Sequence, residues 1–386
     1  MSDIVYPLAS STWGQEEISA INQVIASDMY TMGSKVKQFE EEYAQHFGHG
    51  HAVMCNSGSS ANLLMLSLLK LKYKISGDII VPAVGWSTSY FPVNQNGFKL
   101  NFVDVDPFTF NIDTNKIESA ITPNTSAIMA INLLGNPCDF DAIYKIADKH
   151  NLFVIEDNCE SMGAKYNNKF TGSHGIIGTQ SFFFSHHLQT MEGGMVTVDN
   201  PEDADWLRSL RAHGWCRDLS DTNPLFKKTG GWKDNFTFVT PGYTVRPLEM
   251  SGAVGLEQLK KWQHIMSCRI QNKNYFFEIF GDEKYFKLQK TLGESSWFSF
   301  GCICTGPLKG RRDELVSAFT KAGIQSRPLA SGNWLRQPVM NMLDYIDNGD
   351  YSGADEIEDE GFFVGNGMQD IRAGIDAMHK VVEKLV

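Results

Sequence analysis

The stretch that decides the fold is residues 181–198, which read SFFFSHHLQTMEGGMVTV. It holds an apolar run at Phe182–Phe184, a polar segment, a Glu-Gly-Gly entry and a second apolar run at Met195–Val198. Aromatic and β-branched runs separated by polar, glycine-containing turns are typical of strands. We therefore predict two strands joined by a polar turn that carries His186 and His187.

Apolar runs of the same kind occur upstream and alternate with helical patterns. These runs are Ile79–Val81, Leu100–Val103, Ala127–Ala130 and Phe153–Ile155. The alternation predicts an α/β fold whose central sheet is mostly parallel and has helices on both faces. Apolar residues at helical spacing predict a helix over about Ser34 to Phe47, and Asp139 caps a predicted crossover helix that ends near His150.

The C-terminal part predicts a second unit. A long helical stretch from about Leu248 to Phe280 should leave the large domain, and a strand follows at Phe298–Cys304. We therefore expect a large domain over residues 1–250, and a linking helix with a smaller α/β domain over residues 251–386. The acidic, glycine-containing segment Tyr345–Glu360 is predicted to be a surface loop.

Composition excludes several classes of function. The chain has 386 residues, is 42% hydrophobic and carries a formal charge of -11, without the clustered Lys and Arg that nucleic acids or anionic membranes require. No run is apolar enough to span a bilayer and residues 1–13 lack a signal-peptide pattern, so we expect a cytoplasmic protein. The seven cysteines, of which Cys302 and Cys304 are closest, lack the spacing of a zinc or iron–sulfur site, so we expect no metal.

A small polar loop opens directly into an apolar helix at Asn56–Asn62, which reads NSGSSAN. Backbone N–H groups at a helix N-terminus bind anions, and the serine hydroxyls of this loop suit a phosphate monoester. The alternative is an ordinary serine N-cap without a ligand.

A second polar group follows a buried strand, where Phe153–Ile155 leads into Glu156 and Asp157. Open parallel sheets place ligands at that edge. A carboxylate there suits pairing with a protonated pyridine nitrogen, which keeps the ring able to accept electrons. The alternative is a solvated strand end or a helix cap.

Residues 181–198 closely resemble the sugar aminotransferase family of fold-type-I pyridoxal-phosphate (PLP) enzymes. The family pattern is Ser-Phe, a few residues, Lys, then Glu-Gly-Gly or Asp-Gly-Gly and a strand. His186 stands at the lysine position, and no lysine occurs between Lys169 and Lys227. The resemblance extends from Tyr30–Gly33 to residues 336–338 and implies the PLP-dependent transferase fold. Without it, His186 and its neighbour would be two loop histidines with no role.

The resemblance also implies cofactor contacts. Ser57, Gly58 and Ser59 match the phosphate loop, and Ser181 matches a hydroxyl that holds the same phosphate. Asp157 matches the partner of the pyridine nitrogen.

The resemblance places three further residues near the cofactor. Glu160 falls beside the ring hydroxyl, and Trp86 falls where the family stacks an aromatic on the ring, although it could also be a core tryptophan. Thr244 replaces an asparagine that reaches the cofactor phosphate of a neighbouring subunit.

Histidine at the lysine position changes the expected chemistry, because an imidazole cannot form an imine with PLP. The cofactor should then cycle as pyridoxamine phosphate (PMP), with L-glutamate as the amino donor. Within the family, this change resembles the sugar 3-dehydratases, and Arg211–Trp215 resembles those that act on a GDP-linked 4-keto-6-deoxy sugar for colitose. We expect His186 to act as base and then acid with a pKa near neutrality. Arg217 and Arg327 are candidates for phosphate or carboxylate contacts.

Two alternatives remain at this stage. A CDP-sugar 3-dehydratase would have the same fold, but it is expected to carry a cysteine-held iron–sulfur cluster. A catalytically silent binding protein of the same fold would also explain the missing lysine. The resemblance also implies a homodimer, since family members generally act as dimers.

Overall fold

The computed structural model describes residues 4–386, and its main feature is an eight-stranded sheet of order β1-β9-β8-β5-β4-β2-β3-β13. The strands are β1 (His51–Cys55), β2 (Asp78–Pro82), β3 (Lys99–Val103), β4 (Thr125–Ile131), β5 (Phe153–Asp157), β8 (Gly178–Ser181), β9 (Gly194–Val198) and β13 (Tyr345–Ile346). Only β9 runs against its neighbours, so the predicted mostly parallel sheet is confirmed.

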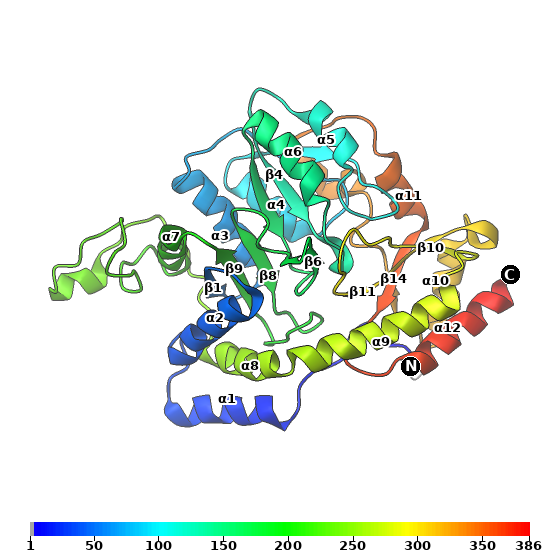
Figure 1. Cartoon of the computed structure of the whole chain (residues 1–386), viewed down its shortest axis with the longest axis horizontal. Coiled ribbons are helices and arrows are strands. Elements are labelled where there is room, and N and C mark those ends of the chain that lie inside the picture. Colours follow the sequence, from blue (N-terminus) through cyan, green and yellow to red (C-terminus); the bar gives the residue numbers. More distant parts are fainter. Residues whose placement is uncertain (1–3) are drawn as a thin grey trace.

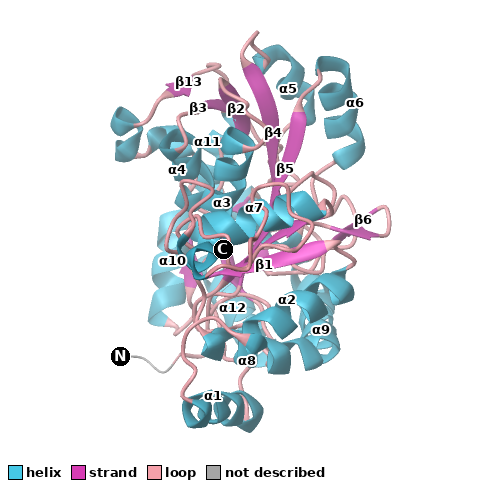
Figure 2. Cartoon of the chain, turned by 90° about the vertical axis from the view of Figure 1, so that its left-hand side faces the viewer, coloured by secondary structure: helices cyan, strands magenta, loops and turns pink. Residues whose placement is uncertain are grey.

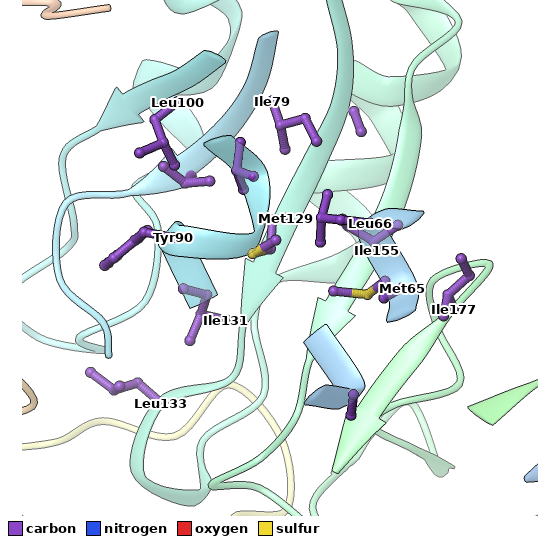
Figure 3. Packing of buried hydrophobic residues seen from close by; sticks show 14 of the residues in the cluster. Met65, Leu66, Ile79, Tyr90, Leu100, Met129, Ile131, Leu133, Ile155 and Ile177 are labelled. Atoms are coloured by element: carbon purple, nitrogen blue, oxygen red, sulfur yellow. The ribbon is translucent and has the colours of Figure 1, made fainter. Parts of the chain in front are cut away.

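Helices cover both faces of this sheet. They are α2 (Ser34–Phe47), α3 (Gly58–Leu71), α4 (Ser87–Gln95), α5 (Thr114–Ala120), α6 (Phe140–His150) and α7 (Pro201–Arg211). Alternate strand residues point to opposite faces, so Ile79 packs with α3 while Ile80 packs with α5 and α6. Figure 3 shows Met65 and Leu66 of α3 against strands β4 and β5. The predicted helices over 34–47 and 139–150 are confirmed, the second with Asp139 as its N-cap.

A second, antiparallel sheet of order β10-β11-β14-β12 lies in the C-terminal part. It comprises β10 (Phe286–Leu288), β11 (Ser299–Cys304), β12 (Ser326–Arg327) and β14 (Gly361–Gly365), with α10 (Arg312–Lys321) and α12 (Arg372–Leu385). A separate aromatic core, which includes Phe276 and Phe300, lies between these elements. A small hairpin, β6 (Lys165–Tyr166) and β7 (Lys169–Phe170), lies apart from both sheets.

The predicted stretch from Leu248 to Phe280 forms two helices, α8 (Glu249–Lys260) and α9 (Trp262–Phe280), which meet at Lys261. Figure 1 shows them along one side of the molecule, with α1 (Gln15–Ser27) next to α8. In Figure 2, α1 and α8 lie at the opposite end of the molecule from α5. The domain boundary between residues 250 and 251 stays a prediction.

Two predicted elements are wrong. The strand at Phe182–Phe184 is instead β8, Gly178–Ser181, because these four residues pair with β9, and Gly178 and Thr179 also pair with β5. Gly178 is tightly packed, since an added Cβ would lie 2.1 Å from the Gly172 carbonyl oxygen. Tyr345–Glu360 is not a loop but contains β13 and α11 (Ser352–Glu360). The first N–H groups of α11 donate to the buried carboxylate of Asp104.

Residues 212–247, here called the arm, leave the body of the protein beyond α7, at the left of Figure 1. One short 3₁₀ turn, Trp232–Phe236, is its regular element. The Trp232 side chain is 72% exposed, and Phe236 and Phe238 are also exposed. Within residues 4–386, no helix combines the length and apolar character needed to cross a bilayer.

Candidate cofactor and active site

The N-terminus of α3 lies against the end of β8. Ser57 caps the helix by accepting a hydrogen bond from the Ser60 N–H at 3.1 Å. Gly58 approaches Ser181 so closely that an added Cβ would lie 2.7 Å from the Ser181 Cβ. Gly194 is also confined, since an added Cβ there would lie 2.2 Å from the Ser57 carbonyl oxygen. Three of the predicted phosphate residues, Ser57, Gly58 and Ser181, are therefore neighbours at one edge of the sheet. Ser59 follows in the first turn of α3 and is exposed.

Asp157 ends β5 beside this loop and is only 5% exposed. Its Oδ2 accepts hydrogen bonds from Asn62 at 2.7 Å and Ser89 at 2.6 Å, and its Oδ1 accepts one from the Cys159 N–H at 3.1 Å. All three donors are neutral, and no Lys or Arg within residues 4–386 forms an ion pair with it. A buried carboxylate without a cation is costly, so this site suits a cationic ligand atom.

Trp86 stands at the N-cap position of α4, close to the same carboxylate. Asn62 donates to both Asp157 and the Thr88 carbonyl, and so ties the start of α4 to the end of β5. The Trp86 side chain is 52% exposed, which makes the core-tryptophan alternative wrong. An exposed indole on the rim of a strand-end site is available for stacking.

The turn between β8 and β9 carries the two histidines. The His186 ring packs edge-on against Phe298, with ring centroids 5.1 Å apart, and the Ser185 hydroxyl lies 3.4 Å from its Nδ1. His187 is fully buried and its Nε2 lies 3.0 Å from the Ser296 carbonyl oxygen. Burial and the charge of Arg269 lower the pKa of His186 to about 3. The imidazole is therefore a neutral base in the cofactor-free chain, which differs from the near-neutral pKa expected from the sequence.

Glu160 lies one turn beyond Asp157, where its Oε2 accepts a hydrogen bond from the Leu134 N–H at 3.1 Å. Burial raises the pKa of this carboxyl to about 7, the Leu134 N–H opposes the rise, and the charge of Asp157 adds to it. Near neutral pH it can therefore donate or accept a hydrogen bond.

The remaining predicted residues lie elsewhere. Thr244 is at the root of the arm, with its hydroxyl 2.7 Å from Nδ1 of His213. Arg217 is within the arm, where its Nε donates to the Asn235 carbonyl and its guanidinium stacks 3.8 Å from the Trp215 ring centroid. Arg327 is exposed on β12 of the small sheet. None of their hydrogen bonds among the described residues reaches Asp157 or His186.

Sequence reasoning missed the groups that hold the predicted ones in place. Asn62 was part of the polar loop but had no role assigned, although its place one turn into α3 points it towards the strand ends. Ser89 and Arg269 had no sequence signal, because their relevance depends on contacts across the fold.

The residues present fit PLP. Gly58 begins α3 in close contact with Ser181, so backbone N–H groups and serine hydroxyls gather at a helix N-terminus, where they can bind a phosphate. The Asp157 carboxylate suits pairing with a protonated ring nitrogen. No group of three or more His, Cys, Asp or Glu suited to a metal ion occurs in the part of the chain that the structure describes.

Known proteins with PLP and related sugar chemistry are similar to this chain over nearly its whole length. A GDP-4-keto-6-deoxy-D-mannose 3-dehydratase from Yersinia pseudotuberculosis is 47% identical, over 99% of this chain and 99% of the relative. The E. coli GDP-4-keto-6-deoxy-D-mannose-3-dehydratase with bound hydrated PLP has a TM-score of 0.95 at 45% identity, covering 98% of this chain and 100% of that one.

A second solved structure is a GDP-4-keto-6-deoxymannose-3-dehydratase with a trapped PLP-glutamate geminal diamine. Its TM-score is 0.94 at 44% identity, and the match covers 98% of this chain and 100% of that one. The family model of the DegT/DnrJ/EryC1/StrS aminotransferases matches residues 11–369. The chain therefore belongs to the DegT/DnrJ/EryC1/StrS aminotransferase family.

Proposed function

We propose that this chain removes the C3 hydroxyl from GDP-4-keto-6-deoxymannose and yields GDP-4-keto-3,6-dideoxymannose for colitose and O-antigen synthesis. It uses PLP and PMP as cofactor forms and L-glutamate as amino donor. The observation that carries the proposal is His186, an imidazole at the lysine position of a site that otherwise fits PLP. The 47% identical relative with this activity supports the sugar and the nucleotide.

When bound, PLP carries the amino group of glutamate and, as PMP, accepts electrons from the sugar. The side chains supply the setting for that chemistry. Asp157 holds a proton on the ring nitrogen, and the start of α3 with Ser57, Gly58 and Ser181 holds the phosphate. Trp86, which is exposed, would lie against one face of the bound ring and exclude water from it.

His186 accepts and then returns a proton at a ring nitrogen. A neutral imidazole is ready to accept one, and Nε2 has no partner among the described residues that would block it. Because imidazole forms no imine, nothing competes with glutamate or sugar for the cofactor aldehyde. The atoms balance overall: the sugar loses one oxygen atom, and glutamate becomes 2-oxoglutarate and ammonia.

We also propose a cytoplasmic homodimer. The arm exposes Trp232, Phe236 and Phe238, which supports this proposal. Thr244 at its root replaces the family asparagine that reaches a neighbouring subunit, and this departure weakens that one contact. A second exposed apolar patch, at Met29, Tyr30 and Leu248, lies at the α1 end of the molecule. All seven cysteines are free, which suits a reducing compartment.

The test is the mass of the sugar after incubation with PLP, L-glutamate and GDP-4-keto-6-deoxymannose, with ammonia assayed in parallel. We expect a product lighter by one oxygen atom and one ammonia per turnover. His186→Asn should lower the rate about 10²- to 10⁴-fold, the usual contribution of a general acid–base group. An amino sugar would mean transamination instead, and unchanged substrate would favour a CDP-sugar dehydratase or a silent binding protein.

A further inference from the structure

Arg269, on α9, is a buried charge without an opposite charge. Its side chain is 2% exposed, and no Asp or Glu within residues 4–386 forms an ion pair with it. Its Nη1 donates to the carbonyl oxygens of Trp297 at 3.1 Å and Phe298 at 3.0 Å. Its Nε has no partner among the described residues. Burial lowers the pKa of this guanidinium to about 10.

Such an arrangement costs stability, because transferring a cation out of water is repaid only by good counter-charges or many hydrogen bonds. Hydrogen bonds to two carbonyl oxygens offset only part of this desolvation cost. An apolar side chain of similar length would fill the same space more cheaply. The reason for a buried arginine at this position must therefore lie in the groups that Arg269 contacts.

Arg269 holds the segment Ser296–Phe298, which contacts both histidines of the β8–β9 turn. The Phe298 ring lies 5.1 Å from the His186 ring and 5.7 Å from the His187 ring. The Ser296 carbonyl oxygen lies 3.0 Å from Nε2 of His187. One guanidinium thus fixes the backbone on which the His186 ring rests.

The charge of Arg269 also acts on the imidazoles. It lowers the pKa of His186 and of His187, in each case after the larger effect of burial. His187 is the other titratable group beside His186, and Glu192, the one carboxylate in residues 182–193, is exposed. Phe183 and Phe298 supply the apolar contacts of the ring.

We propose that Arg269 is a positioning residue for His186: its hydrogen bonds to the Trp297 and Phe298 carbonyls fix that backbone and so hold the Phe298 ring against the imidazole. The kinetic part rests on the proposed dehydration, whereas the titration of His186 does not. Arg269 touches neither cofactor nor sugar in this scheme and acts through Phe298 and its own field.

The test compares Arg269→Met, which removes both charge and hydrogen bonds, with Arg269→Lys, which keeps the charge but not the paired donors. Lys273→Met is the matched control, since Lys273 lies one turn along α9 over the Trp297 ring. NMR of the imidazole carbons in the PLP-loaded protein follows the titration of His186, assigned through His186→Asn.

Arg269→Met should raise the pKa of His186, because the nearby positive charge is removed. It should also lower kcat about tenfold with KM within about twofold, since misplacement of a catalytic group acts mainly on kcat. Arg269→Lys should lower kcat alone, and Lys273→Met should change neither. An unchanged His186 titration in Arg269→Met, or full turnover in both Arg269 variants, would overturn the proposal.

If Arg269→Met does not fold, Phe298→Leu decides the question, because it keeps the apolar volume and Arg269. Phe298→Leu and Arg269→Lys should lower kcat by similar factors, and in the double variant the two losses of kcat should not add. Fully additive losses would overturn the proposal. If the wild type releases no ammonia, the proposed function fails, and the NMR comparison still tests Arg269.

Discussion

Two parts of this molecule bear on the same chemistry in different ways. The strand-end site, formed by Ser57, Gly58, Asp157 and Ser181, is built from close backbone approaches and hydrogen bonds within one chain. The arm, residues 212–247, exposes aromatic rings and has one short 3₁₀ turn as its regular structure. One part is organised before any ligand arrives, and the other presents surface that its own chain does not cover.

This difference indicates a division of roles. Atoms that must hold a cofactor in one orientation are placed by a rigid sheet edge, where small shifts are expensive. The exposed rings of the arm would suit the proposed contacts with substrate or a second subunit, because a segment with few packed contacts costs less to rearrange than a packed core.

The largest effect is expected where the strand-end site is tightest. In Gly58→Ala, the new Cβ would lie 2.7 Å from the Ser181 Cβ, so strand or helix must move at a cost of about 1–3 kcal/mol in the free energy of unfolding. PLP affinity should also fall. Gly231→Ala in the arm is the control and should change neither, because an added Cβ there would lie 3.3 Å from the flexible Thr229 hydroxyl and no closer to any other group. Urea unfolding measures the free energy of unfolding, and PLP titration measures the cofactor affinity. Equal losses in Gly58→Ala and Gly231→Ala would mean that the strand-end site is no more tightly packed than the arm.

A smaller effect concerns the pH dependence of the same site. The pKa of Glu160 is raised from 4.5 to about 7, so the folded chain binds this proton more tightly than the unfolded chain. Its contribution is present at low pH and is lost as the pH rises from about 4.5 to 7. Glu160→Gln cannot ionise, so between pH 5 and 8 its free energy of unfolding should rise relative to that of the wild type by on the order of 1 kcal/mol.

The measurement is the unfolding free energy of the cofactor-free protein at several pH values. The lowered pKa of His186 acts in the opposite direction below pH 6.5, but it is common to both proteins and cancels. Glu192→Gln, at an exposed carboxyl of the β8–β9 turn, is the control. Parallel curves for wild type and Glu160→Gln would show that the fold does not perturb Glu160.

Sequence patterns predicted the strand-end site better than its surroundings. The loop at 56–62 and the carboxylate at 157 were predictable because each follows a short apolar strand, and strand ends of a parallel sheet share one edge. Phe182–Phe184 was misassigned, since the residues that pair with β5 and β9 are Gly178–Ser181, and that pairing is not visible in the apolar pattern.

Long-range contacts explain the other misses. Tyr345–Glu360 contains a strand that pairs with β3 and a helix that Asp104 caps, and both partners lie far away in sequence, so no local pattern contains that information. Arg269 was missed for the same reason, since its two carbonyl partners lie on another segment.

The smallest effect on unfolding is expected in the arm. Trp232 is 72% exposed and its ring contacts Phe236 at a centroid distance of 5.9 Å, so Trp232→Ala should change the unfolding free energy of the isolated chain by less than about 0.5 kcal/mol. Its effect should appear in self-association, because an exposed tryptophan that is buried by a partner is a typical binding hot spot.

Sedimentation over a range of concentrations would measure that association, and we expect Trp232→Ala to weaken it at least about tenfold. Met342→Ala is the matched control, since Met342 is 84% exposed but lies outside the arm. A loss of unfolding free energy as large as that of Gly58→Ala would mean that the arm packs within its own chain. An unchanged association would instead leave the arm to the substrate, and the dimer would then depend on the patch around Tyr30 and Leu248.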